Sequence, residues 1–460
     1  MTLNRIVWRN RSRKPNAPEE SSPKGAFALA KLKVPALSKK FRRRTVLVVA
    51  VTCMIFASGG CTGGGSANSS SIPPFPLYWS VAVGDLNNDG KPDIVTSYSI
   101  IAGPAPDQGF VAVYLQDSAH PGTFLPPVTY SVGNDHDPVF IAIGDLNREG
   151  SLDIVTANTI ISFNGSGSSD VSILLQDSTR PGQFLSATNH ATGKPPVSVA
   201  IGDLNGDGKP DLAVADISGI SLLFQDPSKG GSFLPAMTLS LGPAASSAAI
   251  DDVNGDQKPD VVATTSAAVF VLLQNPTMPG TFFTPTRYGA GSQPIGVAIA
   301  DLNGDGKSDL AVANYGSPTD GSTASVSVLL QNLAAPGTFL SATNYKTDIR
   351  SQIVAIADLN GDGRADLAVA NTGGLAGGCP PDCGIAGASV SVLLQDPALP
   401  GIFQATTKYA GTDQVLSVAV ADMNGDNRAD LVIAQGGGLV IRFQDPSNPG
   451  MFLPQTVVTK

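Results

Sequence analysis

An acidic loop between two short apolar runs carries the side chains of this sequence best suited to chemistry. In its clearest copy, oxygen-bearing side chains stand at loop positions 1, 3, 5 and 9, and a glycine at position 6 permits a sharp bend; these residues are Asp203, Asn205, Asp207, Asp211 and Gly208. Calcium takes roughly 6–8 hard oxygen ligands, and alternate side chains of a tightly curled loop supply most of them. The spacing therefore predicts a calcium-binding loop.

The loop occurs seven times, and its copies differ in completeness. The first, third, fifth and sixth copies keep every position, whereas the second has Glu149 at position 5, the fourth has Gln257 at position 6 and the seventh has Asn427 there. The longer Glu149 side chain would crowd an ion, and a side chain at position 6 makes a left-handed bend costly, although asparagine tolerates it. We expect four strong calcium sites and up to three weaker ones. The expected ligands, in chain order, are Asp85, Asn87, Asp89, Asp93, Asp145, Asn147, Glu149, Asp153, Asp203, Asn205, Asp207, Asp211, Asp252, Asn254, Asp256, Asp260, Asp301, Asn303, Asp305, Asp309, Asp358, Asn360, Asp362, Asp366, Asp422, Asn424, Asp426 and Asp430.

Strands, and not the helices of an EF-hand, must position these loops, because the flanking apolar runs have strand length. Each repeat is predicted to hold four strands, which in the third repeat are 198–204, 211–215, 220–225 and 233–239. Seven units of about four strands suit a closed ring. We therefore expect an all-β fold, a seven-bladed β-propeller of four-stranded antiparallel blades, over residues 76–460.

A second signature lies between the third and fourth strands of each repeat. It reads Gln-Asp-Ser-Ala-His-Pro-Gly-Thr-Phe at 116–124 and Gln-Asp-Pro-Ala-Leu-Pro-Gly-Ile-Phe at 395–403. Pro-Gly favours a tight turn. The phenylalanines that end the signature are predicted to pack between neighbouring blades, with no binding role; they are Phe124, Phe184, Phe233, Phe282, Phe339, Phe403 and Phe452.

Seven copies of a Gly-Asp-Leu-Asn-Gly-Asp-Gly-Lys-Pro-Asp-Leu type core resemble the FG-GAP, or VCBS, repeats of the integrin α-subunit propeller and its bacterial relatives. The resemblance covers about residues 76–460. It implies a seven-bladed propeller whose hairpins between the first and second strands bind calcium, and it says little about the ligand of the protein. The closure of the ring stays open: either residues 452–458 complete the seventh blade alone, or residues 73–78 add a strand to it.

The charge of the chain argues against nucleic acid as a partner. Residues 61–460 carry 36 acidic and 16 basic side chains, and the loops supply 21 of the acids. Clustered carboxylates repel one another unless a cation neutralises them, which favours bound Ca²⁺. The alternative is that the loops are Asx turns that need no metal.

Residues 1–61 are predicted to be an export signal. A basic segment precedes the apolar run 45–57, which is too short to span a bilayer and fits the apolar core of a signal. Small residues before Cys61 resemble a bacterial lipoprotein cleavage site, although Ser58 stands where leucine is usual. Lipidation of Cys61, ordinary cleavage near Ala57 and retention as an uncleaved anchor therefore all stay open.

Residues 62–75, rich in glycine and serine, are predicted to form a flexible linker between this signal and the propeller. We expect a bacterial protein that is exported, either as a lipoprotein of the outer membrane or cell surface or as a secreted protein. Contact with a membrane is expected only through the N-terminal anchor.

The loops between the second and third strands are the candidates for recognition, because variable loops on a rigid frame are where proteins place binding residues. They are short in the third, fourth and seventh repeats and long in the others. The longest contains Cys379 and Cys383, for which a disulfide is expected in an exported protein. Tyr98, Tyr315 and the Cys379–Cys383 loop are the candidate binding residues, and idle variation in loop length is the alternative.

No catalytic residue is expected. The three histidines, His120, His136 and His190, lie in separate predicted turns, and the sequence contains no recognisable Ser-His-Asp set or zinc site. We expect a monomeric binding or adhesion module for a protein or a glycan. The alternatives are a polysaccharide lyase or hydrolase with structural calcium, and a scaffold subunit of an envelope complex.

Overall fold

A computed structural model describes residues 75–101, 107–159, 169–317, 323–375 and 385–459. Contacts between Cα atoms divide the chain into residues 1–34 and 35–460, and all described residues belong to the second unit. These residues form strands and no helix, so they include no helix that could cross a membrane. The predicted signal, the linker up to residue 74, and the Cys379–Cys383 loop lie outside the described residues and stay predictions.

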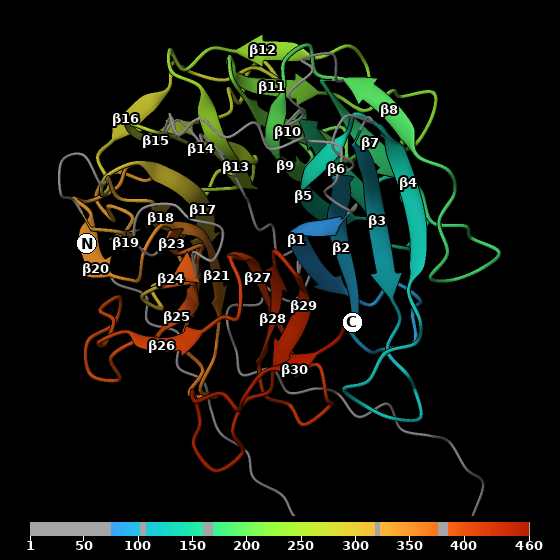
Figure 1. The fold of residues 1–460 in the computed structure, drawn as a ribbon. Coiled ribbons are helices and arrows are strands. Elements are labelled where there is room, and N and C mark those ends of the chain that lie inside the picture. Colours follow the sequence, from blue (N-terminus) through green and yellow to red (C-terminus); the bar gives the residue numbers. More distant parts are fainter. Residues whose placement is uncertain (1–74, 102–106, 160–168, 318–322, 376–384, 460) are drawn as a thin grey trace, which may run out of the picture. The chain divides into compact units, whose positions relative to one another are not determined.

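Seven four-stranded antiparallel sheets form the blades of a propeller, as the sequence predicted, and each blade is a meander of consecutive strands A to D (Figure 1). Blade 1 consists of β1 (Phe75–Gly84), β2 (Asp93–Ile101), β3 (Gln108–Tyr114) and β4 (Val128–Asn134), and blade 2 of β5 (Asp137–Gly144), β6 (Asp153–Thr159), β7 (Asp170–Leu174) and β8 (Thr188–Ala191). Blade 3 consists of β9 (Pro196–Gly202), β10 (Asp211–Asp216), β11 (Gly219–Leu223) and β12 (Met237–Leu239), and blade 4 of β13 (Ala245–Asp251), β14 (Asp260–Thr265), β15 (Ala268–Leu272) and β16 (Thr286–Tyr288).

Blades 5 to 7 follow the same order, and blade 6 carries an additional two-stranded hairpin, β23–β24, between its B and C strands. The strands are β17 (Pro294–Ala300), β18 (Asp309–Asn314), β19 (Ser325–Leu329), β20 (Thr343–Lys346); β21 (Ser351–Ala357), β22 (Asp366–Asn371), β23 (Gly374–Leu375), β24 (Ile385–Ala386), β25 (Ser389–Leu393), β26 (Thr407–Ala410); and β27 (Val415–Ala421), β28 (Asp430–Gln435), β29 (Gly438–Arg442), β30 (Thr456–Val457).

The predicted D strand of blade 3 was wrong at its start. It was expected from residue 233, but β12 begins at Met237. Phe233 instead forms an isolated bridge with Gln225, and Pro235 follows, which has no N–H to donate to a sheet ladder. The hairpin is therefore interrupted before strand D begins.

The ring closes without a shared strand. β30 pairs with β29 inside blade 7, and β1 pairs with β2 inside blade 1. The innermost strands β1 and β27 then lie against each other, as the other neighbouring A strands do. Of the two closures that the sequence left open, the one in which residues 452–458 complete the seventh blade alone is the one observed.

The inner strands are covered on both sides by neighbouring blades, which is why they read as nearly continuous apolar runs. Every residue of β10 is buried, whereas β12 at the outer edge of the same blade is largely exposed. Close packing also explains a glycine at the end of strand A: a Cβ atom at Gly202 would lie 2.7 Å from Cγ2 of Ile250 in the next blade. Small residues are thus needed where the inner strands converge.

The phenylalanines of the second signature pack between blades, as predicted. Phe184 of blade 2 meets Tyr130 of blade 1 edge to face, with ring centroids 5.7 Å apart, and its main-chain N–H donates to the Tyr130 hydroxyl at 3.1 Å. Equivalent edge-to-face pairs join blades 4 and 5, 5 and 6, and 6 and 7. The outer parts of the blades are therefore held by a repeated aromatic contact.

Seven buried glutamines, to which the sequence analysis assigned no role, link each blade to the preceding one. Nε2 of Gln225 in blade 3 donates to the main-chain oxygen of Leu146 in blade 2 at 2.6 Å and to Pro210 of its own blade at 3.0 Å. Gln116 of blade 1 donates in the same way to Met423 of blade 7 at 2.9 Å, which completes the ring. The glutamines are Gln116, Gln176, Gln225, Gln274, Gln331, Gln395 and Gln444.

Replacing Gln225 with methionine should destabilise the propeller by about 1–3 kcal/mol, because two buried carbonyl oxygens lose their donor while the side-chain volume is nearly kept. Guanidinium unfolding of the full chain measures this change. Gln404→Met is the matched control, since Gln404 is exposed. Equal stability of the two variants would contradict the proposed role of the glutamine.

Candidate functional site

The two faces of the propeller differ in character. In each meander the A–B loops and C–D turns share one face, called here the loop face, while the B–C and D–A connections share the opposite, variable face. The acidic loops repeat seven times on the loop face. On the variable face the B–C connections are two residues long in blades 3, 4 and 7 and longer in the others, as the sequence predicted. A site for one ligand is therefore to be sought on the variable face.

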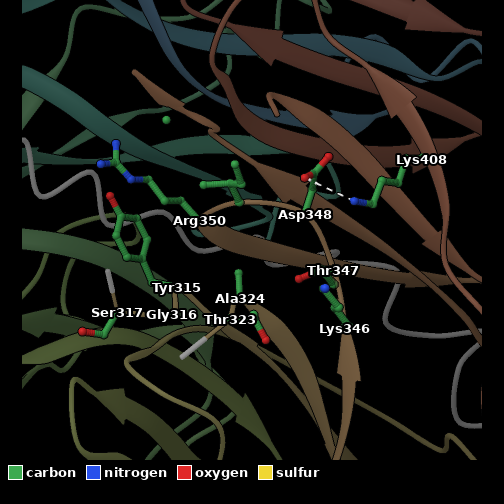
Figure 2. A pocket seen from close by; sticks show the side chains of 12 residues that line it. Tyr315, Gly316, Ser317, Thr323, Ala324, Lys346, Thr347, Asp348, Arg350 and Lys408 are labelled. Atoms are coloured by element: carbon green, nitrogen blue, oxygen red, sulfur yellow. Dashed lines mark ion pairs between the residues drawn. The ribbon is translucent and has the colours of Figure 1, made fainter. Parts of the chain in front are cut away.

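A cavity of about 530 Å³ opens on the variable face between blades 5 and 6 (Figure 2). The B–C connection of blade 5, the connection between β20 and β21, and the strands β23 and β26 supply its walls. This blade 5–6 cavity is lined by Tyr315, Gly316, Ser317, Thr323, Ala324, Lys346, Thr347, Asp348, Ile349, Arg350, Gly374 and Lys408. Its volume lies within the range of about 300–1,000 Å³ that is typical of small-ligand sites.

Charged side chains occupy two ends of this cavity (Figure 2). At one end the guanidinium carbon of Arg350 lies 5.7 Å from the centroid of the Tyr315 ring, a cation–π contact. At the other end Nζ of Lys408 lies 3.2 Å from Oδ1 of Asp348, whose Oδ2 accepts a hydrogen bond from Ser389 at 3.0 Å. The structure thus places Tyr315, a predicted binding residue, in a polar cavity.

Tyr98, the other predicted aromatic, has different surroundings. It lies in β2 and stacks between Tyr78 and Phe110, with both pairs of ring centroids 5.3 Å apart. The three rings pack within blade 1, and Tyr78 and Tyr98 also contact the apolar cluster shared by blades 7 and 1. The contacts of Tyr98 support a structural role, and the structure does not bring it together with Tyr315.

The histidines form no nucleophile–base set within the described residues. His120 pairs with Asp117 in an exposed turn, and His190 lies in β8, where its ring meets Phe233 edge to face, so it is not in a turn as predicted. His136 is buried against Asp170, with Nε2 3.0 Å from Oδ2, and this hydrogen bond raises the pKa of His136. It is a packed polar contact between blades 1 and 2.

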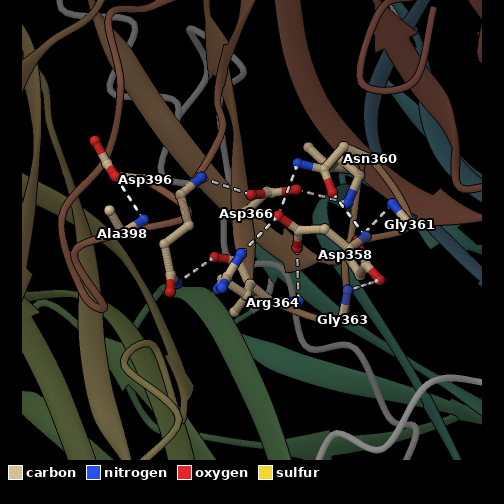
Figure 3. A network of polar contacts seen from close by, with 12 residues as sticks. Asp358, Asn360, Gly361, Gly363, Arg364, Asp366, Asp396 and Ala398 are labelled. Atoms are coloured by element: carbon tan, nitrogen blue, oxygen red, sulfur yellow. Dashed lines mark hydrogen bonds and ion pairs between the residues drawn. The ribbon is translucent and has the colours of Figure 1, made fainter.

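The predicted metal ligands lie together loop by loop on the loop face, in a shared pattern of hydrogen bonds (Figure 3). In the sixth loop, Oδ1 of Asp358 and Oδ1 of Asn360 both accept from the main-chain N–H of Asp362, at 3.1 and 2.9 Å. Oδ2 of Asp358 accepts from Gly363 at 2.8 Å. The oxygens of positions 1 and 3 therefore converge on the interior of the loop, as in an Asx turn.

Position 9 of every loop is a fully buried aspartate. Oδ2 of Asp211 accepts from the main chain of Leu204 at 2.9 Å, and its Oδ1 accepts from the main chain of Gln225 at 2.8 Å. Burial, with a smaller effect from neighbouring loop carboxylates, raises the pKa of the position-9 aspartates, to about 6 for Asp93 and Asp153 and to about 7 for the other five. A nearby cation would instead favour their charged form.

The loop donors suit calcium in kind, since each loop offers three carboxylates and one amide carbonyl, all hard oxygens. The positions of these donors, in contrast, do not form a metal site in the described residues. Both oxygens of the position-9 carboxylate already accept main-chain hydrogen bonds, and the described residues contain no group of three or more His, Cys, Asp or Glu side chains arranged to hold a metal ion. Calcium binding by the 28 predicted residues therefore stays a prediction.

Each loop contains two residues with left-handed backbone. Position 6 has positive φ in all seven copies, including Gln257 at 68° and Asn427 at 63°, as the glycine pattern implied. Position 4 is also left-handed, at 58° for Asn88 and 63° for Arg148, which the sequence analysis did not single out. Five copies have glycine at position 4, so the signal was present in the repeat and was overlooked.

Sequence reasoning also missed the charged residues of the blade 5–6 cavity. Lys346, Asp348, Arg350 and Lys408 come from two separate segments and match no motif. The available signal was compositional: three of the few basic residues of the acidic propeller fall near the ends of the repeats that form blades 5 and 6. Only the fold brings them to one cavity.

Comparisons with known proteins bear on the repeats. A family model for FG-GAP-like repeats matches residues 159–214, 252–312 and 305–369, and one for the FG-GAP repeat matches residues 77–114. No curated protein sequence matched the chain.

Solved structures with a similar fold are distant in sequence. An Agrocybe aegerita lectin that recognises non-reducing terminal N-acetylglucosamine is 18% identical, covering 82% of this chain and 94% of the lectin, with a TM-score of 0.49. The rhamnogalacturonan lyase YesW is 15% identical, covering 80% of this chain and 71% of the lyase, with a TM-score of 0.46. A Bacillus licheniformis rhamnogalacturonan lyase is 15% identical over 81% of this chain and 72% of its own, with a TM-score of 0.46.

Replacing Gln257 with glycine should stabilise the protein by on the order of 0.5–1 kcal/mol, because relief of the left-handed strain outweighs the greater freedom of glycine in the unfolded chain. Gly208→Gln, the reverse change at the same position of the third loop, should destabilise it. Thermal unfolding of both variants beside the parent chain measures the two shifts. Shifts of the same sign would show that left-handed backbone strain at position 6 does not determine how the third and fourth loops affect stability.

Proposed function

This chain belongs to the FG-GAP repeat family, and on that premise we propose that it is a calcium-stabilised propeller acting outside the cytoplasm as a binding module for a protein or a glycan. Positions 1, 3, 5 and 9 of the loops would hold Ca²⁺. The ion would act as a structural crosslink, because it would join both ends of the A–B hairpin. The four complete loops are the strongest candidates.

The contrast between the two faces carries the binding half of this proposal. The loop face repeats one motif seven times, which suits a frame. The variable face holds the blade 5–6 cavity, which is lined by aromatic, charged and hydroxyl side chains. A rigid frame with a non-repeating polar cavity is typical of a recognition site.

Of the enzyme alternatives, a polysaccharide hydrolase has less support. Hydrolysis of glycosides commonly uses two carboxyl groups on either side of the bond that breaks. Among the residues that line the cavity, Asp348 is the single carboxylate, and it is paired with Lys408. The charged lining favours holding a ligand over hydrolysing it.

Removal of calcium should lower the melting temperature of the full chain, and by more at pH 8 than at pH 5. At roughly 1 mM Ca²⁺ and dissociation constants on the order of 10⁻⁴ M, four sites contribute about 5–6 kcal/mol. In metal-free protein the position-9 aspartates have pKa values raised to about 6 or 7, so the stability they provide is full at acid pH and is lost as pH rises through that range. Bound calcium would offset that loss.

Scanning calorimetry with Ca²⁺ and with excess chelator, at both pH values, measures these shifts. Asp203→Asn, which removes one carboxylate from a complete loop, should reduce the calcium-dependent part of the shift. Equal melting temperatures in calcium and chelator at both pH values would leave the loops as hydrogen-bonded turns.

Binding by the variable face is tested with the full chain in calcium buffer over immobilised neutral and acidic polysaccharides. We expect at least one of them to be bound, and the double variant Tyr315→Ala/Lys346→Ala to weaken that binding about ten-fold or more. Leu185→Ala, at an exposed position of the C–D segment of blade 2, is the control. Undiminished binding by the double variant would contradict the assignment, and release of shortened products would favour the enzyme alternative.

A further inference from the structure

We propose that the blade 5–6 cavity binds a sugar that bears a carboxylate, a hexuronate unit of an acidic glycan, with Arg350 as the contact to the carboxylate. This inference rests on the proposed binding function and names the ligand class of that same face. Four observations carry it: the local charge, the setting of Arg350, the polar end at Asp348, and the size of the cavity.

The cavity is cationic within an acidic protein. Its lining contains Lys346, Arg350 and Lys408 against the single carboxylate of Asp348, whereas residues 61–460 carry 36 acidic and 16 basic side chains. Lys408 is paired with Asp348. Among the described residues no carboxylate lies within ion-pair distance of Lys346 or Arg350. The charges of Arg350 and Lys346, which lie toward different ends of the cavity (Figure 2), are therefore not balanced by a described carboxylate.

The backbone around Arg350 holds its side chain at the cavity in spite of local strain. Its φ of 60° lies in the left-handed region, where L side chains are rare. The turn is fixed from blade 6, since Thr372 and Gly373 donate main-chain hydrogen bonds to the oxygens of Arg350 and Ile349, both at 3.1 Å. The same turn occurs at Gln293 before blade 5, where Tyr315 and Gly316 donate the equivalent main-chain hydrogen bonds, so the frame of the propeller fixes the place from which the Arg350 side chain starts.

The guanidinium group of Arg350 is oriented as well as placed. Its cation–π contact with Tyr315 limits the directions that the group can take. A planar guanidinium suits a carboxylate because two parallel N–H groups can donate to its two oxygens. Neutral sugars lack such an acceptor, so this contact would separate acidic from neutral ligands.

The opposite end of the cavity suits sugar hydroxyls. The Asp348 carboxylate is an acceptor whose charge Lys408 balances, and Lys346 and Thr323 also line the walls. Hydroxyl groups donate to carboxylates and accept from lysine and threonine. A ligand with a carboxylate at one end and hydroxyls along its ring would therefore satisfy both ends.

The shape of the site favours such a sugar over an acidic peptide. The volume of about 530 Å³ fits a small-ligand site, and most of the lining comes from connections between the strands of two blades. An extended peptide is usually held by main-chain pairing along a free sheet edge, whereas the edge strands β20 and β26 contribute only one residue each, Lys346 and Lys408, to the lining. Acidic peptide is thus the competing ligand for the experiment to exclude.

The test is calorimetric titration of the full chain with an oligogalacturonate, with the same oligosaccharide after methyl esterification, and with an oligoglutamate peptide. We expect binding of the oligogalacturonate, weaker binding at high salt, and at least ten-fold weaker binding of the ester. Arg350→Gly should also weaken binding at least ten-fold without lowering the melting temperature, because glycine accepts the left-handed backbone.

Asp135→Gly is the matched control, since Asp135 is another left-handed residue, at φ 55°, in the turn between blades 1 and 2. It should leave the affinity unchanged. Equal affinity of the parent chain and Arg350→Gly, or a preference for the ester or the peptide, would overturn the inference. Binding of neutral glycans alone would also overturn it, yet would leave the proposed binding function standing.

Discussion

The peptide groups at position 2 of each acidic loop are held from two blades at once, and the rest of the structure depends on this constraint. The N–H of Leu204 donates to the buried Asp211 of its own blade, and its carbonyl accepts from Gln274 of the next blade. The same pair of bonds occurs at all seven junctions. Because both partners are buried, breaking either bond leaves a polar group without a partner. Loop conformation and blade spacing are therefore set together.

This constraint also explains why the two faces differ. The loop face must repeat, since every copy supplies an aspartate to its own hairpin and receives a glutamine from its neighbour. No equivalent ring of contacts ties the described B–C connections of the variable face. Their length can change without disturbing a junction, which leaves that face free to acquire a cavity such as the one between blades 5 and 6. A repeated frame and a variable face thus follow from one hydrogen-bond pattern.

The sequence was informative wherever a pattern repeats. The loops, the seven blades, the short B–C turns and the packing of residues such as Phe184 follow from motifs that seven copies make unmistakable. It was silent on contacts between repeats, because nothing in a single copy says that Gln225 reaches Leu146. It also overestimated Tyr98, whose neighbours Tyr78 and Phe110 are brought to it by strand pairing. It missed Arg350, which only the fold places in a cavity wall.

Closure by side-by-side packing has a further consequence. Since β1 and β30 each belong wholly to their own blade, the junction of blades 7 and 1 has the same strand packing as the other six and the equivalent hydrogen bond, from Gln116 to Met423. Phe75 begins the first strand of blade 1, and Val457 ends the last strand of blade 7. Both described ends of the chain therefore belong to the junction of blades 7 and 1. The seven blades are therefore nearly equivalent by rotation about the axis of the ring. The fold does not depend on which blade comes first in the chain. A circular permutation that opened any other D–A connection would preserve every blade intact.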